Sequence, residues 1–399
     1  MPAGYLSSYF EGIASKRLSA VEADPGTSNQ HEINGVQGLK QLFGTARRTI
    51  AAQFVYLGEN EEQALSASGF LTWYDARENH PTRSEHRLYF PTTSVSGAAR
   101  EGDLLVIGKR PDGNAMVIVV AGGSTYENQL SWLFGLPGPS PLFSVHEISR
   151  ASDLELGFAA RFILEELGIE VEKADENWLD RILQQFPSGF PATRIFSAFA
   201  RETVPRVASG DDPDLVLMSW LEQEEMLFRT LEKHIVAKRL EGGFGDVEDF
   251  ISYSLSVQNR RKSRVGYALE NHLEEILRNN RVTYARGQET ENKAKPDFVF
   301  PGITHYRNRD FPEARLTMLG VKSTCKDRWR QVLSEAARIS PKHLLTLEPG
   351  ISENQTDEMK ANSLNLVVPE TIHATYRDSQ KEWLVDVKGF IALVRERQQ

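Results

Sequence analysis

Two carboxylates and one lysine in the C-terminal half of the chain are of the types needed to cut a phosphodiester bond. Asp297 begins a short apolar run, Lys322 ends another run 25 residues later, and Glu335 follows 13 residues after that. Carboxylate oxygens are the ligands that Mg²⁺ prefers, and a lysine ammonium can orient the attacking water and neutralise charge developing on phosphorus. We therefore expect Asp297 and Glu335 to hold Mg²⁺ and Lys322 to act on the phosphate. The alternative is that Glu335 is a solvated helix residue, paired with Gln331 or Arg338.

The elements that must position these residues are predicted from the pattern of apolar residues. Short runs at 297–300, 317–321, 344–347 and 364–368 indicate strands, and a helix is expected from about 327 to 339. Neighbouring strands would bring Asp297 and Lys322 together, and the helix would return Glu335 to the same edge. Upstream, apolar residues at helical spacing predict helices over 215–240 and 263–279, with a further helical stretch at 246–255. This order predicts a mixed sheet flanked by helices.

The N-terminal third has a different pattern. Leu104–Ile107 and Met116–Val120 are short β-branched runs separated by a Pro-Asp-Gly-Asn turn, which predicts a hairpin. A cluster of Pro and Gly residues at 136–141 and a helical pattern at 152–171 follow. We expect a mainly β domain at 1–150, a linker region at 151–175 and an α/β domain at 176–399.

Two short stretches are rich in positive charge. Arg260, Arg261, Lys262 and Arg264 have no acid among them, and a second basic segment follows Lys322, interrupted only by Asp327. We interpret the first stretch as phosphate contacts, which orient DNA without specifying sequence.

The bulk composition fits a soluble protein with local rather than global affinity for nucleic acid. The net charge of −9 argues against nonspecific coating of nucleic acid, but a sequence-specific enzyme needs only local basic patches. No apolar run is long enough to span a bilayer and no secretion signal is recognised, so we expect a cytoplasmic location and no membrane partner. The single cysteine, Cys325, excludes disulfide scaffolds and multi-cysteine zinc sites.

The stretch from Ser256 to Leu333 resembles the catalytic domain of the EcoRII restriction endonuclease family, and the block after the second strand is the most specific part. Weaker similarity extends through 186–189 and 366–369. The matching segments are Asn259-Arg260-Arg261-Lys262-Ser263-Arg264, Lys295-Pro296-Asp297-Phe298 and Val321-Lys322-Ser323-Thr324-Cys325-Lys326-Asp327-Arg328-Trp329-Arg330-Gln331.

The resemblance implies a restriction-endonuclease-like α/β catalytic domain of the PD-(D/E)xK class, with a displaced acid at Glu335. It implies Asp297 and Glu335 as Mg²⁺ ligands, Lys322 as the catalytic lysine, and Glu270 as a further acid near the metal. It also implies that the segment after Lys322 reads G·C pairs, since Arg or Lys donates to guanine and a carboxylate accepts from cytosine N4. The residues of that segment are Lys326, Asp327 and Arg328. The alternative is that Asp327 only caps a helix.

In the N-terminal region the resemblance implies a β-pseudobarrel effector domain that binds a second copy of the DNA site and relieves a block of the catalytic cleft. Arg83, Glu85 and Arg87 alternate, so on a strand they would share one face that could read a groove. The alternative is a solvated strand with cross-strand ion pairs. The candidate DNA contacts of this domain are Lys16, Arg17, His31, Arg83, Glu85 and Arg87.

The expected activity is site-specific cleavage of double-stranded DNA by a type II restriction endonuclease, at a short C·G-rich palindromic or pseudopalindromic site. A palindromic site matches a twofold homodimer, and a cognate DNA methyltransferase is expected in the same system but not as a stable partner. Two alternatives stay open. One is a modification-dependent nuclease that reads 5-methylcytosine, and the other is a catalytically silent DNA-binding regulator.

Overall fold

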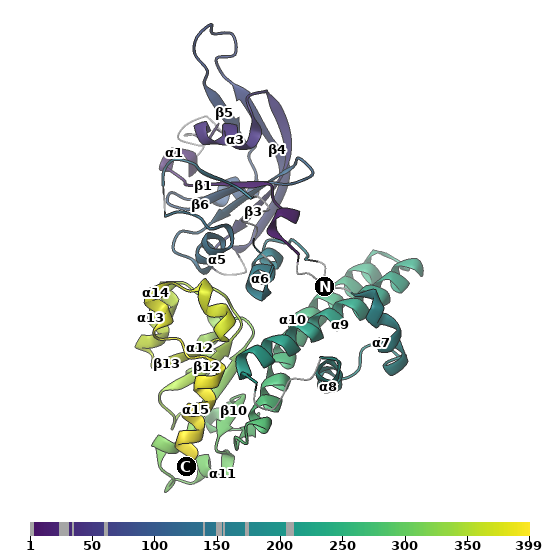
Figure 1. Cartoon of the computed structure of the whole chain (residues 1–399), viewed down its shortest axis with the longest axis vertical. Coiled ribbons are helices and arrows are strands. Elements are labelled where there is room, and N and C mark those ends of the chain that lie inside the picture. Colours follow the sequence, from purple (N-terminus) through teal and green to yellow (C-terminus); the bar gives the residue numbers. More distant parts are fainter. Residues whose placement is uncertain are drawn as a thin grey trace. The chain divides into compact units, whose positions relative to one another are not determined.

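The computed structural model describes residues 4–23, 32–33, 36–59, 63–138, 140–148, 154, 156–171, 175–204 and 211–399. It divides into two compact units, Met1–Val171 with Pro349–Gln355, and Glu172–Glu348 with Thr356–Gln399. Both are drawn in Figure 1.

The first unit is built on one eight-stranded sheet with the strand order β2-β5-β4-β3-β7-β6-β1-β8. Its strands are β1 (Gly12–Arg17), β2 (Glu32–Ile33), β3 (Arg48–Leu57), β4 (Leu65–Asp75), β5 (His86–Tyr89), β6 (Leu104–Lys109), β7 (Ala115–Val120) and β8 (Ser144–Glu147). Its helices are η1 (Leu6–Ser8), α1 (Ala20–Ala23), η2 (Val36–Leu39), α3 (Lys40–Phe43), α4 (Ser94–Ala98), α5 (Thr125–Phe134) and α6 (Phe158–Glu166).

The centre of this sheet is buried on both faces. Strands β6 and β7 pair antiparallel, as the Pro-Asp-Gly-Asn turn predicts. Val106 and Ile118 enter one apolar cluster, while Ile107 and Val117 enter the cluster on the opposite face. Because successive strand residues point to opposite faces, a strand buried on both sides has a continuous apolar sequence. The mainly β character predicted for the N-terminal region is confirmed.

Helix α6 lies within the range where we expected a linker. Its residues Ala160, Ile163 and Leu164 are buried in the apolar cluster of the first unit, together with Leu156. The described part of 151–171 is therefore packed on the N-terminal core, and the division between the units comes after Val171.

The second unit joins a helical part to a five-stranded sheet. Its strands are β9 (Ala285–Arg286), β10 (Phe298–Phe300), β11 (Thr317–Lys322), β12 (Lys342–Thr346) and β13 (Leu364–Val367). Its helices are η4 (Glu176–Trp178), α7 (Leu179–Gln185), α8 (Thr193–Thr203), α9 (Pro213–Glu241), α10 (Val247–Asn279), η5 (Glu291–Lys293), α11 (Ile303–Arg307), η6 (Glu313–Arg315), η7 (Lys326–Arg328), α12 (Trp329–Val332), α13 (Glu353–Ala361), η8 (Glu370–Thr375), α14 (Asp378–Lys381) and α15 (Val387–Gln398).

Two long helices, α9 and α10, run side by side in this unit (Figure 1). Helix α9 begins at a side-chain cap from Asp212 followed by proline, and ends at Gly242. Helix α10 begins at a cap from Asp246 and runs unbroken to Asn279. The two helical stretches expected at 246–255 and 263–279 are thus one helix, whose last third turns a buried apolar side toward the sheet.

The sheet of the second unit has the order β13-β12-β11-β10-β9. Strands β11, β12 and β13 are parallel, whereas β10 is antiparallel to β11 and to β9. The mixed sheet flanked by helices is therefore as predicted, and four of its strands fall on the predicted runs.

The helix expected from 327 to 339 is wrong in extent. The chain forms the single turn η7 and the short α12, and then leaves helical geometry before Glu335. Ala336 has a positive φ of 46°, which an α-helix does not accommodate. Glu335 therefore lies in a bend rather than on a helix.

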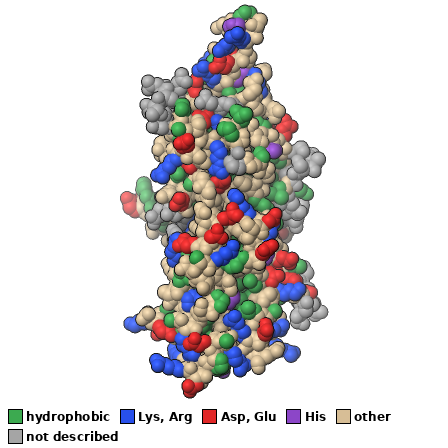
Figure 2. Space-filling view, turned by 90° about the vertical axis from the view of Figure 1, so that its left-hand side faces the viewer, with side chains coloured by type: hydrophobic (Ala, Val, Ile, Leu, Met, Phe, Trp, Pro, Cys, Tyr) green, Lys and Arg blue, Asp and Glu red, His purple; other side chains and the backbone are tan. Residues whose placement is uncertain are grey.

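The surface mixes both signs of charge. On the face shown in Figure 2, Lys and Arg side chains are interspersed with Asp and Glu side chains. Among the described residues, no helix has the length and apolar character needed to cross a membrane.

Candidate active site

The ends of two neighbouring strands bring Asp297 and Lys322 into contact. The register of β10 and β11 pairs Phe298 with Leu319, which places Asp297 beside the end of β11. The Nζ atom of Lys322 donates to Oδ2 of Asp297 at 2.9 Å, and the backbone N–H of Val321 donates to the same oxygen at 2.6 Å. The side chains of Asp297 and Lys322 are 17% and 20% exposed, so solvent and substrate can reach the pair.

Glu335 is held near this pair by a turn that Lys342 stabilises. The buried ammonium of Lys342 donates to the carbonyl oxygens of Ala336 at 3.1 Å and Ile339 at 3.0 Å. These bonds close the turn after α12 and fix the backbone next to Glu335. The charges of both Lys322 and Asp297 act on Glu335, so Glu335 lies within electrostatic range of this pair.

The ionisation of Glu335 is strongly perturbed. Burial raises its pKa to about 7, the positive charge of Lys322 lowers it, and the negative charge of Asp297 raises it again. Its Oε2 atom is buried and has no hydrogen-bond partner among the described residues. A buried carboxylate oxygen without a donor is costly, and a divalent cation would satisfy it. The donor set of Asp297 and Glu335 therefore fits a hard cation such as Mg²⁺.

Glu270 lies near Asp297 but its carboxylate is already bonded. Its Oε2 accepts from Nη2 of Arg286 at 2.8 Å. Burial and then the charge of Asp297 raise the pKa of Glu270, while the bond from Arg286 lowers it. In the described part of the chain, no three His, Cys, Asp or Glu side chains form a cluster that could hold a metal ion. Glu270 is thus ion-paired with Arg286, and its role as a metal ligand stays a prediction.

The segment after Lys322 forms the short 3₁₀ turn η7. The backbone N–H groups of Cys325 and Lys326 donate to Oε2 of the buried Glu348, at 2.5 and 3.2 Å. Arg328 is exposed and its Nη2 donates to the carbonyl oxygen and the hydroxyl of Thr324. The side chain of Asp327 lies outside the described residues. Lys326 and Arg328 thus lie on a turn whose backbone is fixed by hydrogen bonds to the buried Glu348.

The four basic residues of the stretch on α10 differ in burial and in their ion pairs. Arg264 is 5% exposed, is ion-paired with Glu225, and lies over the ring of Phe228. Arg261 pairs with Glu232 at 2.6 Å. A phosphate contact does not fit the buried position of Arg264, because its charge is already matched by an acid on α9.

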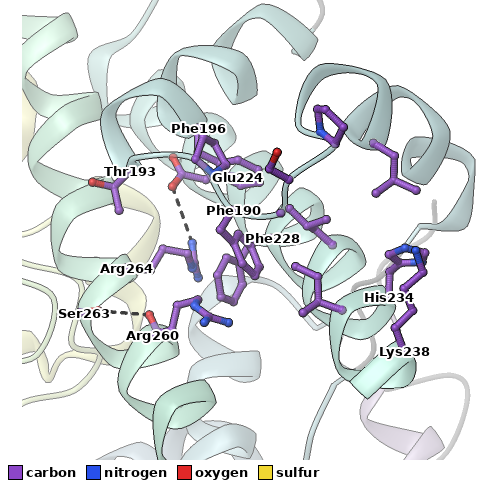
Figure 3. A pocket seen from close by; sticks show the side chains of 17 residues that line it. Phe190, Thr193, Phe196, Glu224, Phe228, His234, Lys238, Arg260, Ser263 and Arg264 are labelled. Carbon is purple, nitrogen blue, oxygen red and sulfur yellow. Dashed lines mark hydrogen bonds and ion pairs between the residues drawn. The ribbon is translucent and has the colours of Figure 1, made fainter. Parts of the chain in front are cut away.

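The other members of this stretch remain accessible. Lys262 is exposed, and Arg260 lies over the ring of Phe190 at 5.0 Å. Figure 3 shows Arg260 and Arg264 pointing toward Phe190 and Phe228 in a pocket of about 630 Å³. Of the four predicted phosphate contacts, Lys262 is exposed, Arg260 and Arg261 are half-buried, and Arg264 is buried.

The predicted contacts on β1 are both ion-paired. Lys16 is 4% exposed and bonds to Glu22 at 2.6 Å. Arg17 pairs with Glu127 and donates to the carbonyl oxygen of Gly102 at 2.8 Å. Lys16 therefore belongs to a buried ion pair with Glu22, and a DNA contact does not fit its position.

The residues predicted to share a strand face are only partly on a strand. Strand β5 begins at His86, so Arg87 lies on it, while Arg83 and Glu85 precede it. Glu85 bonds to Arg87 at 2.9 Å, and Arg87 also bonds to Glu32. These residues line one wall of a cleft of about 510 Å³, and Arg83 is exposed beside it. His31 lies outside the described residues.

Sequence reasoning missed three residues at the site: Arg286, Lys342 and Glu348. Glu348 follows the end of β12, the parallel neighbour of the strand that ends at Lys322. An acid after a neighbouring parallel strand is a signal that could have been used. Arg286 and Lys342 gave no such signal, because Lys342 bonds to backbone carbonyl oxygens and Arg286 reaches across from β9 to α10.

The sequence of the chain is similar to that of a known protein family. A family model described as the EcoRII C-terminal domain matches residues 228–391. The chain is 42% identical over 393 residues to the type II restriction enzyme EcoRII of Escherichia coli, covering 94% of this chain and 92% of that protein.

Solved structures of two DNA complexes are also similar to part of the chain. Metal-depleted Ecl18kI in complex with uncleaved DNA matches 57% of this chain and 85% of that chain, with 17% identity and a TM-score of 0.46. A complex of the restriction endonuclease PspGI with substrate DNA matches 52% of this chain and 93% of that chain, with 14% identity and a TM-score of 0.42. The sequence relative is the stronger finding, and it shows that this chain belongs to the EcoRII family of type II restriction enzymes, site-specific deoxyribonucleases.

Proposed function

We propose that this restriction endonuclease requires Mg²⁺ and cuts both strands of a short C·G-rich palindromic site, leaving 5′-phosphate ends. The observation that carries the proposal is the contact between Asp297 and Lys322, with the unpartnered carboxylate oxygen of Glu335 close by. A bound Mg²⁺ would be held by Asp297 and Glu335, would lower the pKa of a water and would neutralise a phosphate oxygen.

The residues of the chain have separate tasks in this scheme. Lys322 presents its ammonium to the scissile phosphate and stabilises the charge that develops as water attacks phosphorus and the bond to the 3′ oxygen breaks. The Val321 N–H and Lys322 fix the Asp297 carboxylate by bonds to one oxygen, Oδ2, and this leaves Oδ1 for a ligand. The turn closed by Lys342 fixes the backbone next to Glu335, whose carboxylate would be the second ligand of a bound ion.

Recognition of the site is proposed for the turn after Lys322. Lys326 and Arg328 can donate to guanine in the major groove, and Asp327 can accept from cytosine N4. Lys262 and Arg260 would contact phosphates and set the register. We propose that two copies of the chain act together, because a palindromic site presents the same bases to each.

We also propose that the first unit binds a second DNA site and so activates cleavage. The cleft beside β5 supports this, since Ser84, Glu85, His86 and Arg87 line it and Arg83 lies next to it. A cytoplasmic location and a methyltransferase that modifies the same site complete the scheme, since a cell must protect its own DNA from such an enzyme.

The central test uses Lys322→Ala in the full-length protein. We expect this variant to bind duplex DNA like the parent in a gel-shift assay and to cut none of it with Mg²⁺. Lys381→Ala, an exposed lysine on α14, is the matched control and should cut normally. Sequencing the ends made by the parent gives the site and the position of the 5′ phosphate. Normal cutting by Lys322→Ala would refute the assignment of this site.

A further inference from the structure

Arg286 is a cation that binds acidic side chains near the candidate active site. Its Nη2 donates to Glu270 at 2.8 Å, and its Nη1 donates to Glu274 at 2.7 Å and to the amide oxygen of Asn271 at 3.0 Å. The three partners lie within about one turn of α10, so a single guanidinium bridges them. Glu274 has a second cationic partner in Arg194.

The position of Arg286 is fixed relative to the cleavage site by the sheet. Arg286 lies opposite Phe298 in the pairing of β9 with β10. The backbone N–H of the next residue, Gly287, donates to the carbonyl oxygen of Asp297 at 3.0 Å. The backbone that carries the guanidinium is therefore tied to the residue that binds Lys322.

The balance of charge shows what this arrangement does. The acids Asp297, Glu335 and Glu270 face the cations Lys322 and Arg286, and Lys342 also acts on Glu335. Arg286 is the cation that is bonded directly to Glu270. Without Arg286, the nearby cation acting on Glu270 would be Lys322, which is already bonded to Asp297. The Glu270 carboxylate would then be available to a further cation.

We propose that Arg286 takes the place of a second divalent ion beside Glu270, so that each active site holds a single ion, between Asp297 and Glu335. This inference rests on the proposed function, because it assumes that these two carboxylates bind the ion. Arg286 is then a positioning residue, since it acts on the ion site through Glu270. It also explains why Glu270 lies beside Asp297 without serving as a ligand. The side chains of Glu270 and Arg286 are 21% and 19% exposed, so an ion could enter if the pair were opened.

The experiment counts Mn²⁺ ions bound per chain by electron paramagnetic resonance and by calorimetry, in the full-length protein without DNA. The parent should bind one ion. Arg286→Gln should bind two, Arg286→Lys should bind one, and the double variant Arg286→Gln with Glu270→Gln should return to one. A purely structural role for Arg286 would lower stability without adding an ion, so an unchanged count of one in folded Arg286→Gln overturns the inference.

A second variant keeps the test decisive if Arg286→Gln fails to fold. Glu270→Gln in the parent background should still bind one ion, with an affinity within about threefold of the parent. Loss of that ion would mean that Glu270 is a ligand and would overturn the inference. Asp297→Asn separates the two proposals: it should bind none, and retention of the ion in that variant refutes the proposed metal site itself. A parent that binds two ions refutes only the role of Arg286.

Discussion

The raised pKa of Glu335 predicts that the metal affinity of this enzyme depends on pH near neutrality. An ordinary glutamate is fully ionised above pH 6, but burial raises the pKa of Glu335 to about 7. A proton on the carboxylate competes with a metal ion for the same oxygen. The affinity should therefore fall as the pH is lowered through 7 and level off above 8.

The size of the effect follows from the ionised fraction of one group. With a pKa of about 7, roughly a tenth of Glu335 is ionised at pH 6 and roughly nine tenths at pH 8, a ratio of about tenfold. Calorimetric titration of the DNA-free protein with Mn²⁺ should show the dissociation constant rising about tenfold from pH 8 to pH 6. Repeating the titration in buffers of different ionisation enthalpy should show about 0.9 protons released at pH 6 and about 0.1 at pH 8.

Two variants decide whether Glu335 is the group responsible. Glu335→Gln should bind Mn²⁺ weakly at every pH, without the tenfold change, because it has no proton to release. Glu396→Gln, an exposed glutamate on α15, should follow the parent curve. If the parent affinity is constant between pH 6 and pH 8, Glu335 is already ionised at pH 6 and the argument from its burial is refuted.

Three further predictions separate structural from functional roles of basic residues. Arg264→Ala should destabilise the protein by about 1–3 kcal/mol in thermal or denaturant unfolding, because the partly buried Glu225 on α9 loses one arginine partner and keeps Arg229. Lys262→Ala should instead leave stability unchanged and reduce the slope of log binding constant against log salt by about 1; the reverse result would contradict both placements. Lys342→Met should lower the single-turnover cleavage rate more than tenfold with unchanged DNA binding, since two bonds that close the turn are lost; equal rates would show that the turn holds without them. Arg83→Ala should weaken binding of a second duplex to the first unit, while Lys16→Met should change only stability; a binding defect in Lys16→Met alone would reverse this assignment.

The parts of the fold that the sequence predicted are those set by local patterns. Strands β10 and β11 are mostly apolar and buried because central strands of the sheet are covered on both faces. The placement of Asp297 and Lys322 at neighbouring strand ends follows from these runs. The hairpin of β6 and β7 could also be predicted, since its turn residues and its β-branched strands both indicate a hairpin.

The parts that could not be predicted depend on partners distant in sequence. The residues after Trp329 have a helical apolar pattern, yet the chain leaves the helix because Arg338 donates to the carbonyl oxygens of Tyr306, Asn308 and Phe311 and Lys342 closes the turn. The basic stretch on α10 contains no acidic residue, but α9 supplies acidic partners for Arg261 and Arg264. Arg264 is therefore half of a buried ion pair. A short stretch of sequence cannot reveal these interactions, because the partners are not part of it.

The two ligands proposed for the ion are held by different kinds of interaction, and this determines how each responds to change. Asp297 is fixed by strand pairing and by a backbone N–H, so any change that moves it also disturbs the sheet. Glu335 depends on a turn that a buried lysine stabilises. Removing an ammonium from water has a large cost, and here the cost is offset by bonds to the carbonyl oxygens of Ala336 and Ile339. A turn held in this way can be changed without unfolding the sheet, so substitutions at Lys342 should alter ion binding and cleavage while leaving the recognition segment after Lys322 in place.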